Sequence, residues 1–220
     1  MDAHSNNNAD HSINLLRNSL ANGRLGHAYM FVGGDIKNLE LNAIELARTL
    51  NCQSPSNISE TNLPLDSCGE CIACRKLDTQ NFPDLDVIRP ESKSRVITVD
   101  QIRTLIQKIS LKPTEGRFKI AIISNAERMP SVTVNAFLKT LEEPPDFTVF
   151  ILLTRHPEKI IDTVQSRCLR LNFEGETGIH LETEDKNWLN SFVSMSVQTN
   201  EGLMGRYRLL SSLSSHLAAK

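Results

Sequence analysis

Short apolar runs, bounded by polar residues, glycines or prolines, recur along the chain and indicate strands. The run FKIAIIS is almost continuously apolar, as is typical of a strand that is covered on both faces in a parallel sheet. The pattern predicts strands at His27–Val32, Leu85–Ile88, Phe118–Ser124, Thr148–Leu153 and Leu169–Phe173.

Between these runs, apolar residues recur at helical spacing. Ser12 is placed to cap a first helix, Thr98 and Gln101 form a T-x-x-Q capping box before another, and Ser131 is placed to cap a third. A short helix is predicted over Pro157–Gln165. Strands that alternate with helices indicate a three-layer α/β domain, with a parallel five-stranded sheet and right-handed crossovers.

Composition divides the chain into one folded domain and flanking segments. Residues 1–12 are polar and Asn-rich, so we expect a disordered tail, and residues 13–174 carry the predicted strands and helices. An insertion at about 51–80 is rich in Ser, Asn, Pro and Cys, and it shows no periodicity and no apolar core of its own. Residues 175–186 are acidic, as expected of a linker, and residues 187–220 are predicted to be helical.

The composition is that of an ordinary folded protein, with 40% hydrophobic and 23% charged residues. The formal net charge of −2 gives no support to a general electrostatic grip on nucleic acid. No apolar run approaches the roughly 20 residues of a membrane span, and the first residues do not resemble an export signal. We therefore expect a cytoplasmic protein that does not enter membranes.

Four of the five cysteines, Cys52, Cys68, Cys71 and Cys74, form the pattern C-x15-C-x2-C-x2-C. Four thiolates satisfy tetrahedral zinc and leave no open position, so the pattern predicts a structural Zn²⁺ site whose metal supplies much of the insertion's folding energy. The alternatives are a set of reduced buried thiols and a redox-active CxxC pair. Cys168 stands apart and is interpreted as a packed thiol.

The glycines Gly33 and Gly34 follow the first predicted strand, where a phosphate-binding loop G-x-x-x-x-G-K-[ST] would begin. The motif's second glycine, lysine and hydroxyl would then fall on Asn38, Leu39 and Glu40. Leu39 has no charge, Glu40 would repel phosphate, and Lys37 stands two positions early.

The strand FKIAIIS would end in an acidic pair in a nucleotide-hydrolysing domain, one residue for Mg²⁺ and one to activate water. This chain has Ser124 and Asn125 there, and Glu127 comes two residues later. Two interpretations are open: the fold never bound nucleotide, or it is a nucleotide-binding fold whose site no longer works.

Several ordered segments resemble the bacterial clamp-loader subunits of the AAA+ superfamily. They are RLGHAYMF at Arg24–Phe31, NAFLKTLEEPP at Asn135–Pro145 and TRHPEKIIDTVQSRC at Thr154–Cys168. In that family a four-cysteine zinc module interrupts the domain after its first helix, where the cysteines lie here. The resemblance covers about residues 13–173 and implies an AAA+/RecA-like P-loop fold.

The family includes subunits without a working nucleotide site, and the degenerate loop resembles theirs, so we expect no ATP binding. Ser166–Arg167–Cys168 matches the family's SRC motif, whose arginine reaches the nucleotide site of a neighbouring motor subunit. The resemblance thus implies that Arg167 acts in trans; the alternative is a surface arginine in an ion pair. Thr154 matches a γ-phosphate sensor or is only a strand-end hydroxyl. Lys139 and Glu142–Glu143 are interpreted as a solvated helix end; the alternative is that they contact a neighbouring subunit or DNA.

The resemblance implies as partners the motor and wrench subunits of a clamp loader and, through them, a sliding clamp and primed DNA. Family members also carry a helical lid and a helical collar. We expect residues 187–220 to be a helical remnant of the lid region and the collar to be absent. Two other functions remain open. The chain could be an active ATPase that uses Lys37 and Glu127, or a zinc-dependent module that binds nucleic acid or protein.

Overall fold

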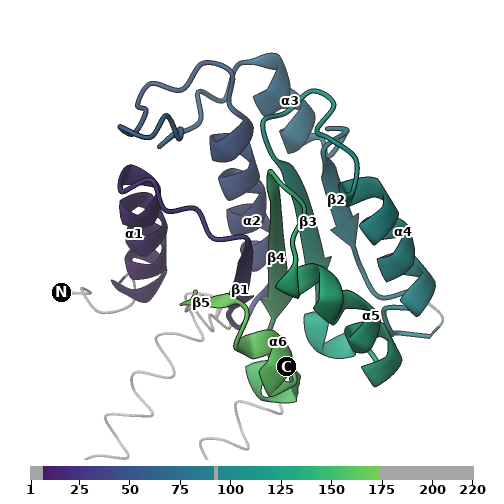
Figure 1. Cartoon of the computed structure of the whole chain (residues 1–220). Coiled ribbons are helices and arrows are strands. Elements are labelled where there is room, and N and C mark those ends of the chain that lie inside the picture. Colours follow the sequence, from purple (N-terminus) through teal and green to yellow (C-terminus); the bar gives the residue numbers. More distant parts are fainter. Residues whose placement is uncertain (1–6, 92–93, 174–220) are drawn as a thin grey trace, which may run out of the picture. The chain divides into compact units, whose positions relative to one another are not determined.

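The computed structural model describes residues 7–91 and 94–173 (Figure 1). Its sheet has the order β2-β3-β4-β1-β5, and every neighbouring pair is parallel. The predicted α/β fold with five parallel strands is confirmed. The strands are β1 (Ala28–Val32), β2 (Leu85–Ile88), β3 (Lys119–Ser124), β4 (Thr148–Thr154) and β5 (Leu169–Asn172).

Helices cover both faces of this sheet. One core packs α1 and α2 against the sheet, and the other packs α4, α5 and α6 against the opposite face. The chain runs from β1 to the edge strand β2 and then comes back across the sheet through β3, β4 and β5. Because crossovers between parallel strands are right-handed, the reversal of direction at β2 places α2 on one face of the sheet and α4, α5 and α6 on the other. The helices are α1 (Asn7–Ala21), α2 (Ile36–Asn51), α3 (Ile72–Asp78), α4 (Val99–Ile109), α5 (Ser131–Glu142) and α6 (Asp162–Gln165), with 3-10 turns η1 (Ala126–Arg128) and η2 (Pro157–Lys159).

Three local predictions need correction. Helix α1 begins at Asn7, inside the expected tail 1–12, and Ser12 is an internal residue whose hydroxyl donates to the Asn172 carbonyl at 2.6 Å. Ser131 is the first residue of α5 and gives no capping bond. The predicted helix over Pro157–Gln165 is divided into η2 and α6. The capping box of Thr98 and Gln101 is confirmed.

The insertion packs apolar residues into the core of the domain. Residues Leu63, Ala73 and Leu77 are buried in the core that lies between α2 and the sheet. Asn51, at the start of the insertion, accepts hydrogen bonds from the N–H groups of Arg117 and Phe118 at 2.8 and 2.9 Å. The insertion is therefore attached to the domain by packing as well as by its chain ends.

The predicted linker 175–186 and helical segment 187–220 lie outside the described residues. Within residues 7–91 and 94–173, none of the helices has both the length and the apolar character needed to cross a membrane.

Candidate functional site

The carboxyl ends of parallel strands meet at one edge of the sheet, and ligands of doubly wound folds bind there. Gly33 follows β1 at this edge, and its N–H donates to the Thr154 carbonyl at 3.2 Å. A Cβ at position 33 would lie 2.3 Å from the Phe173 carbonyl oxygen, which follows β5. Only glycine therefore fits at Gly33, whereas Gly34 is exposed.

The structure gives the residues of the degenerate loop other contacts. Leu39, at the place of the motif's lysine, is 1% exposed and packs in the core. The carboxylate of Asp35 caps α2 and accepts a hydrogen bond from the Lys37 N–H at 2.9 Å. The N-terminus of a helix attracts anions, and here a carboxylate of the chain itself occupies that position.

Glu40, at the place of the motif's hydroxyl residue, forms an ion pair with Arg89. Glu40 accepts hydrogen bonds from Nε and Nη2 of Arg89 at 3.2 and 2.9 Å. Asn38 uses its carbonyl to accept a hydrogen bond from the Asn42 amide at 2.8 Å. Neither residue presents a group suited to Mg²⁺ and phosphate together.

The end of β3 also differs from an acidic pair. Ser124 is buried, and its hydroxyl has no hydrogen-bond partner among the described residues. Asn125 adopts the left-handed conformation, with φ of 53°, and turns the chain into η1. Glu127 then reaches back, and its carboxylate accepts a hydrogen bond from the Thr154 hydroxyl at 2.7 Å. Glu127 thus lies closer to this edge than its place in the sequence indicates.

The four sulfur atoms of Cys52, Cys68, Cys71 and Cys74 all lie within 4.8 Å of one another. Backbone N–H groups donate to three of them: Cys68 to Cys52 at 3.3 Å, Cys71 to Cys68 at 3.3 Å, and Cys74 to Cys71 at 3.5 Å. The four cysteines of the pattern C-x15-C-x2-C-x2-C therefore form a compact cluster that could hold a metal ion.

The pKa values of these thiols differ because their environments differ. Burial alone would raise the pKa of Cys71, but N–H donation from Cys74 and Gln53 outweighs it and lowers the pKa to about 6. Burial raises the pKa of Cys74 to about 12. A bound cation would favour the thiolate form of all four cysteines, including Cys74.

The donor set fits tetrahedral zinc. Zn–S bonds of about 2.3 Å place the sulfurs of a tetrahedral site roughly 3.8 Å apart, so only a small contraction of the cluster is needed. Cys168 lies elsewhere, packed against the core formed with α4 and α5, and burial raises its pKa to about 12.

Arg167 follows α6 and is held on both sides of its guanidinium. Its Nη2 donates to Glu142 at the end of α5 at 2.7 Å, and its Nη1 donates to the Thr163 carbonyl at 2.8 Å. The side chains of Arg167 and Glu142 are 35% and 49% exposed. The sequence analysis placed Glu142 at a solvated helix end and did not connect it with Arg167, because no local pattern connects two residues that are 25 positions apart.

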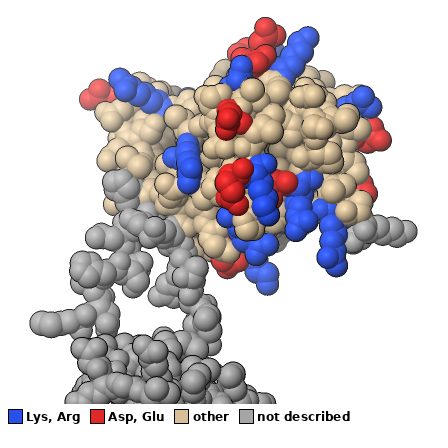
Figure 2. All heavy atoms as spheres, turned by 90° about the horizontal axis from the view of Figure 1, so that it is seen from below, with Lys and Arg blue, Asp and Glu red and all other residues tan. Residues whose placement is uncertain are grey.

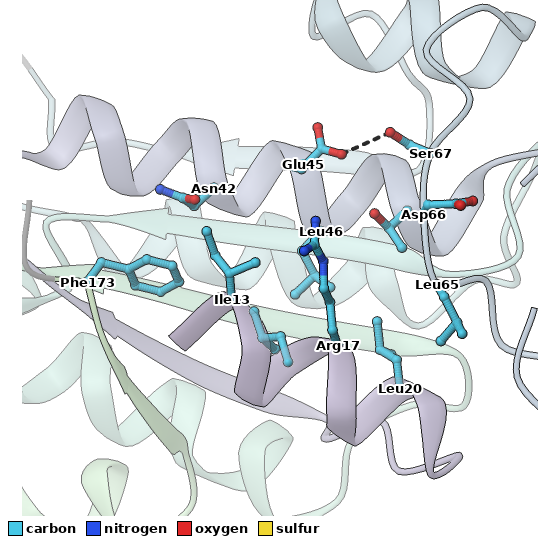
Figure 3. A pocket seen from close by; sticks show the side chains of 12 residues that line it. Ile13, Arg17, Leu20, Asn42, Glu45, Leu46, Leu65, Asp66, Ser67 and Phe173 are labelled. Atoms are coloured by element: carbon cyan, nitrogen blue, oxygen red, sulfur yellow. Dashed lines mark hydrogen bonds between the residues drawn. The ribbon is translucent and has the colours of Figure 1, made fainter. Parts of the chain in front are cut away.

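A cavity of about 310 Å³ lies between α1, α2 and the insertion (Figure 3). Its wall is largely apolar, and Arg17 reaches across it from α1 toward α2. At its rim, Glu45 accepts a hydrogen bond from the Ser67 hydroxyl at 2.9 Å. Phe173 connects this cavity to the carboxyl edge beside Gly33.

Figure 2 shows the molecule from below Figure 1, toward the carboxyl ends of the strands. Lysine and arginine side chains gather over part of this face, and acidic side chains lie among them. The mixture agrees with the small net charge, and it gives no continuous basic track on the described part of this face.

Comparison with known proteins gives the family of this domain. Residues 8–177 match the family described as DNA polymerase III, delta subunit. The chain belongs to this family. The expected resemblance to AAA+ clamp-loader subunits is confirmed, and this member of the DNA polymerase III delta subunit family carries the loop after β1, the cysteine cluster and Arg167 on the family's domain.

Individual relatives agree with this assignment. The chain is 33% identical over 162 residues to DNA polymerase III subunit delta′ of Bacillus subtilis, covering 74% of this chain and 46% of that protein. It is 35% identical over 165 residues to subunit tau of Escherichia coli, covering 75% of this chain and 24% of that protein. The chain thus spans less than half the length of these relatives.

A solved structure shows the same fold. A DNA polymerase III gamma subunit-related protein from Thermotoga maritima aligns with a TM-score of 0.55 at 22% identity, covering 82% of this chain and 49% of that protein. The likeness supports the arrangement of strands and helices described above.

Proposed function

We propose that this chain acts as the delta-prime subunit of a bacterial clamp loader and does not hydrolyse ATP itself. Delta′ subunits of Bacillus subtilis and Escherichia coli are among its relatives, each 33% identical to it. One observation carries the proposal: Leu39 is buried in the core at the position where a phosphate-binding loop needs its lysine. Without that ammonium group, the loop lacks its contact with the β and γ phosphates.

In this proposal, Arg167 is an arginine finger that stabilises charge on the γ-phosphate bound by a neighbouring motor subunit. Its guanidinium is partly exposed and attached to the end of α6, so it can contact a neighbour. The motor and wrench subunits are the direct partners. A sliding clamp and primed DNA are the indirect ones, and the cytoplasm is the location.

The four-cysteine cluster holds a structural zinc ion in this proposal. All four ligands come from the insertion, and Cys71 also caps α3, with its sulfur accepting from the Cys74 N–H. The metal would connect the start of the insertion at Cys52 to α3. It takes no part in a reaction, because four protein ligands leave no position for substrate.

Binding of Mg-ATP to the isolated chain tests the non-hydrolysing assignment. We expect no heat of binding by isothermal titration calorimetry at concentrations up to the millimolar range typical of weak ligands, about 1 mM. A hydrolysing motor subunit of the same loader provides the positive control. A micromolar dissociation constant for the isolated chain would contradict the proposal.

A second candidate function, ATP hydrolysis by the chain itself, is supported by one contact. Glu127 lies 2.7 Å from the Thr154 hydroxyl at the carboxyl edge, where an acid that activates water would be needed. Steady-state hydrolysis by the purified chain, abolished by Glu127→Gln, would favour this function over the first.

A further inference from the structure

We propose that Glu142 is a positioning residue that holds Arg167 ready for the nucleotide of a neighbouring subunit. This inference rests on the proposed arginine finger. It begins from a contact network around one guanidinium: Nη2 donates to Glu142 at 2.7 Å, and Nη1 donates to the Thr163 carbonyl at 2.8 Å and to the Ser166 hydroxyl at 3.3 Å.

The two anchors come from different helices. Thr163 belongs to α6, one turn before Arg167, whereas Glu142 is the last residue of α5. Local contacts alone would fix the guanidinium only relative to its own turn. The carboxylate of Glu142 fixes it relative to α5, whose inner face is anchored in the core by Phe137 and Leu141.

The exposure of this pair argues against a mainly structural role. Arg167 is 35% exposed and Glu142 is 49% exposed. Ion pairs in this environment add little to folding stability because solvent screens them and two long side chains lose freedom. The contact therefore has more effect on where the guanidinium points than on whether the domain folds.

The contact also leaves the guanidinium able to bind phosphate. Guanidinium carries five N–H donors in a planar fork, and the described residues accept three hydrogen bonds from it. No hydrogen bond from Nε is found among the described residues. A phosphate oxygen can use the remaining donors while Glu142 and Thr163 keep the plane in place, so that the finger loses little freedom when it binds.

Glu143 offers a matched control. It is the next residue, it carries the same charge, and it is exposed, but no ion pair of its carboxylate is found among the described residues. A general effect of negative charge at the end of α5 would appear equally in Glu142→Gln and Glu143→Gln. An effect through Arg167 would appear only in the first.

The experiment measures ATP turnover at saturating ATP in a clamp loader reconstituted from the full protein with its motor and wrench subunits, clamp and primed DNA. The Arg167-dependent turnover is the part that Arg167→Ala removes. We expect Glu142→Gln to lower this part roughly tenfold, because misplaced catalytic groups lose rate steeply. We expect Glu143→Gln to leave it unchanged, and the melting temperature and loader assembly to be the same in all variants.

A double-mutant cycle separates positioning from structure. In the Arg167→Ala background, Glu142→Gln should have no further effect on turnover. If Arg167→Ala leaves turnover unchanged, the proposed arginine finger itself is wrong. If Arg167→Ala lowers turnover but Glu142→Gln behaves like Glu143→Gln, only the positioning role is wrong. Increased turnover in Glu142→Gln would show that the carboxylate keeps Arg167 away from the neighbouring nucleotide, which also overturns the inference.

Discussion

At the scale of single residues, Asp84 shows how one buried carboxylate organises a loop. Its side chain is fully buried and accepts hydrogen bonds from the N–H groups of Thr114, Glu115 and Gly116 at 2.7 to 2.9 Å. The Lys119 ammonium lies 3.6 Å away. This arrangement fixes the chain just before β3, the strand that leads to Ser124 and Asn125.

Asp84→Asn is expected to lower the free energy of unfolding by about 1–3 kcal/mol, because the amide replaces one acceptor oxygen by a donor that faces N–H groups. Chemical denaturation in urea measures this. Asp146→Asn is the control, since Asp146 is exposed and its carboxylate has no hydrogen-bond partner among the described residues. Equal stability of the two variants would contradict the role of Asp84.

The same carboxylate gives stability a pH dependence. Burial alone would raise the pKa of Asp84, but the N–H groups of Gly116, Thr114 and Glu115 and the charge of Lys119 outweigh it and lower the pKa. A lowered pKa in the folded state means that the stabilisation is present above the ordinary carboxyl pKa and is lost as pH falls through the folded value. Asp84→Asn should therefore flatten the acid side of the stability profile.

At the scale of elements, local signals were predictable and long-range ones were not. The capping box at Thr98 depends on residues three positions apart, so the start of α4 could be predicted from the sequence. The role of Ser12 in α1 could not, since its hydroxyl donates to the carbonyl of Asn172, 160 positions away. Helix α3 is short, and its buried residues Ala73, Cys74 and Leu77 lie among charged side chains, so the helical period is hard to recognise.

The insertion is expected to contain one zinc ion per chain by elemental analysis. Cys71→Ser should abolish zinc binding and expose the amides of α3 to hydrogen exchange, because the metal and the cap at Cys71 hold the same helix. Cys168→Ser is the control and should keep the full zinc content, since Cys168 packs in a different core. A metal-free protein with a protected α3 would exclude a structural zinc site.

At the scale of the whole molecule, periodicity and alternation were enough to predict the sheet, because buried parallel strands have a strong apolar signature. The chemistry at its edge was only partly predictable. Residue types showed what Leu39 and Glu40 lack, but only the fold shows what they do instead: Leu39 fills the core, and Glu40 binds Arg89. Likewise, the motif identified Arg167 but not its partner Glu142.

Arg167→Ala is expected to lower the ATP turnover of a reconstituted clamp loader while the subunit still assembles. An arginine finger contributes about 10³–10⁵ in turnover at the site it serves, so the loader should lose nearly all of that site's share. A coupled ATPase assay with clamp and primed DNA measures the loss, and size-exclusion chromatography checks assembly. Arg170→Ala is the control, because Arg170 is exposed on β5. Unchanged turnover in Arg167→Ala would contradict the proposed arginine finger.

The contacts around Asp35, Leu39 and Glu40 have a consequence for how this domain could change over time. Leu39 and Glu40, two of the positions that would have to mutate to complete a phosphate-binding motif, already make other contacts in the fold. A lysine at position 39 would carry charge into an apolar interior, and loss of Glu40 would remove the ion-pair partner of the partly exposed Arg89. A change toward the phosphate-binding motif would therefore include a destabilising step at position 39, so the packing of this core opposes that change.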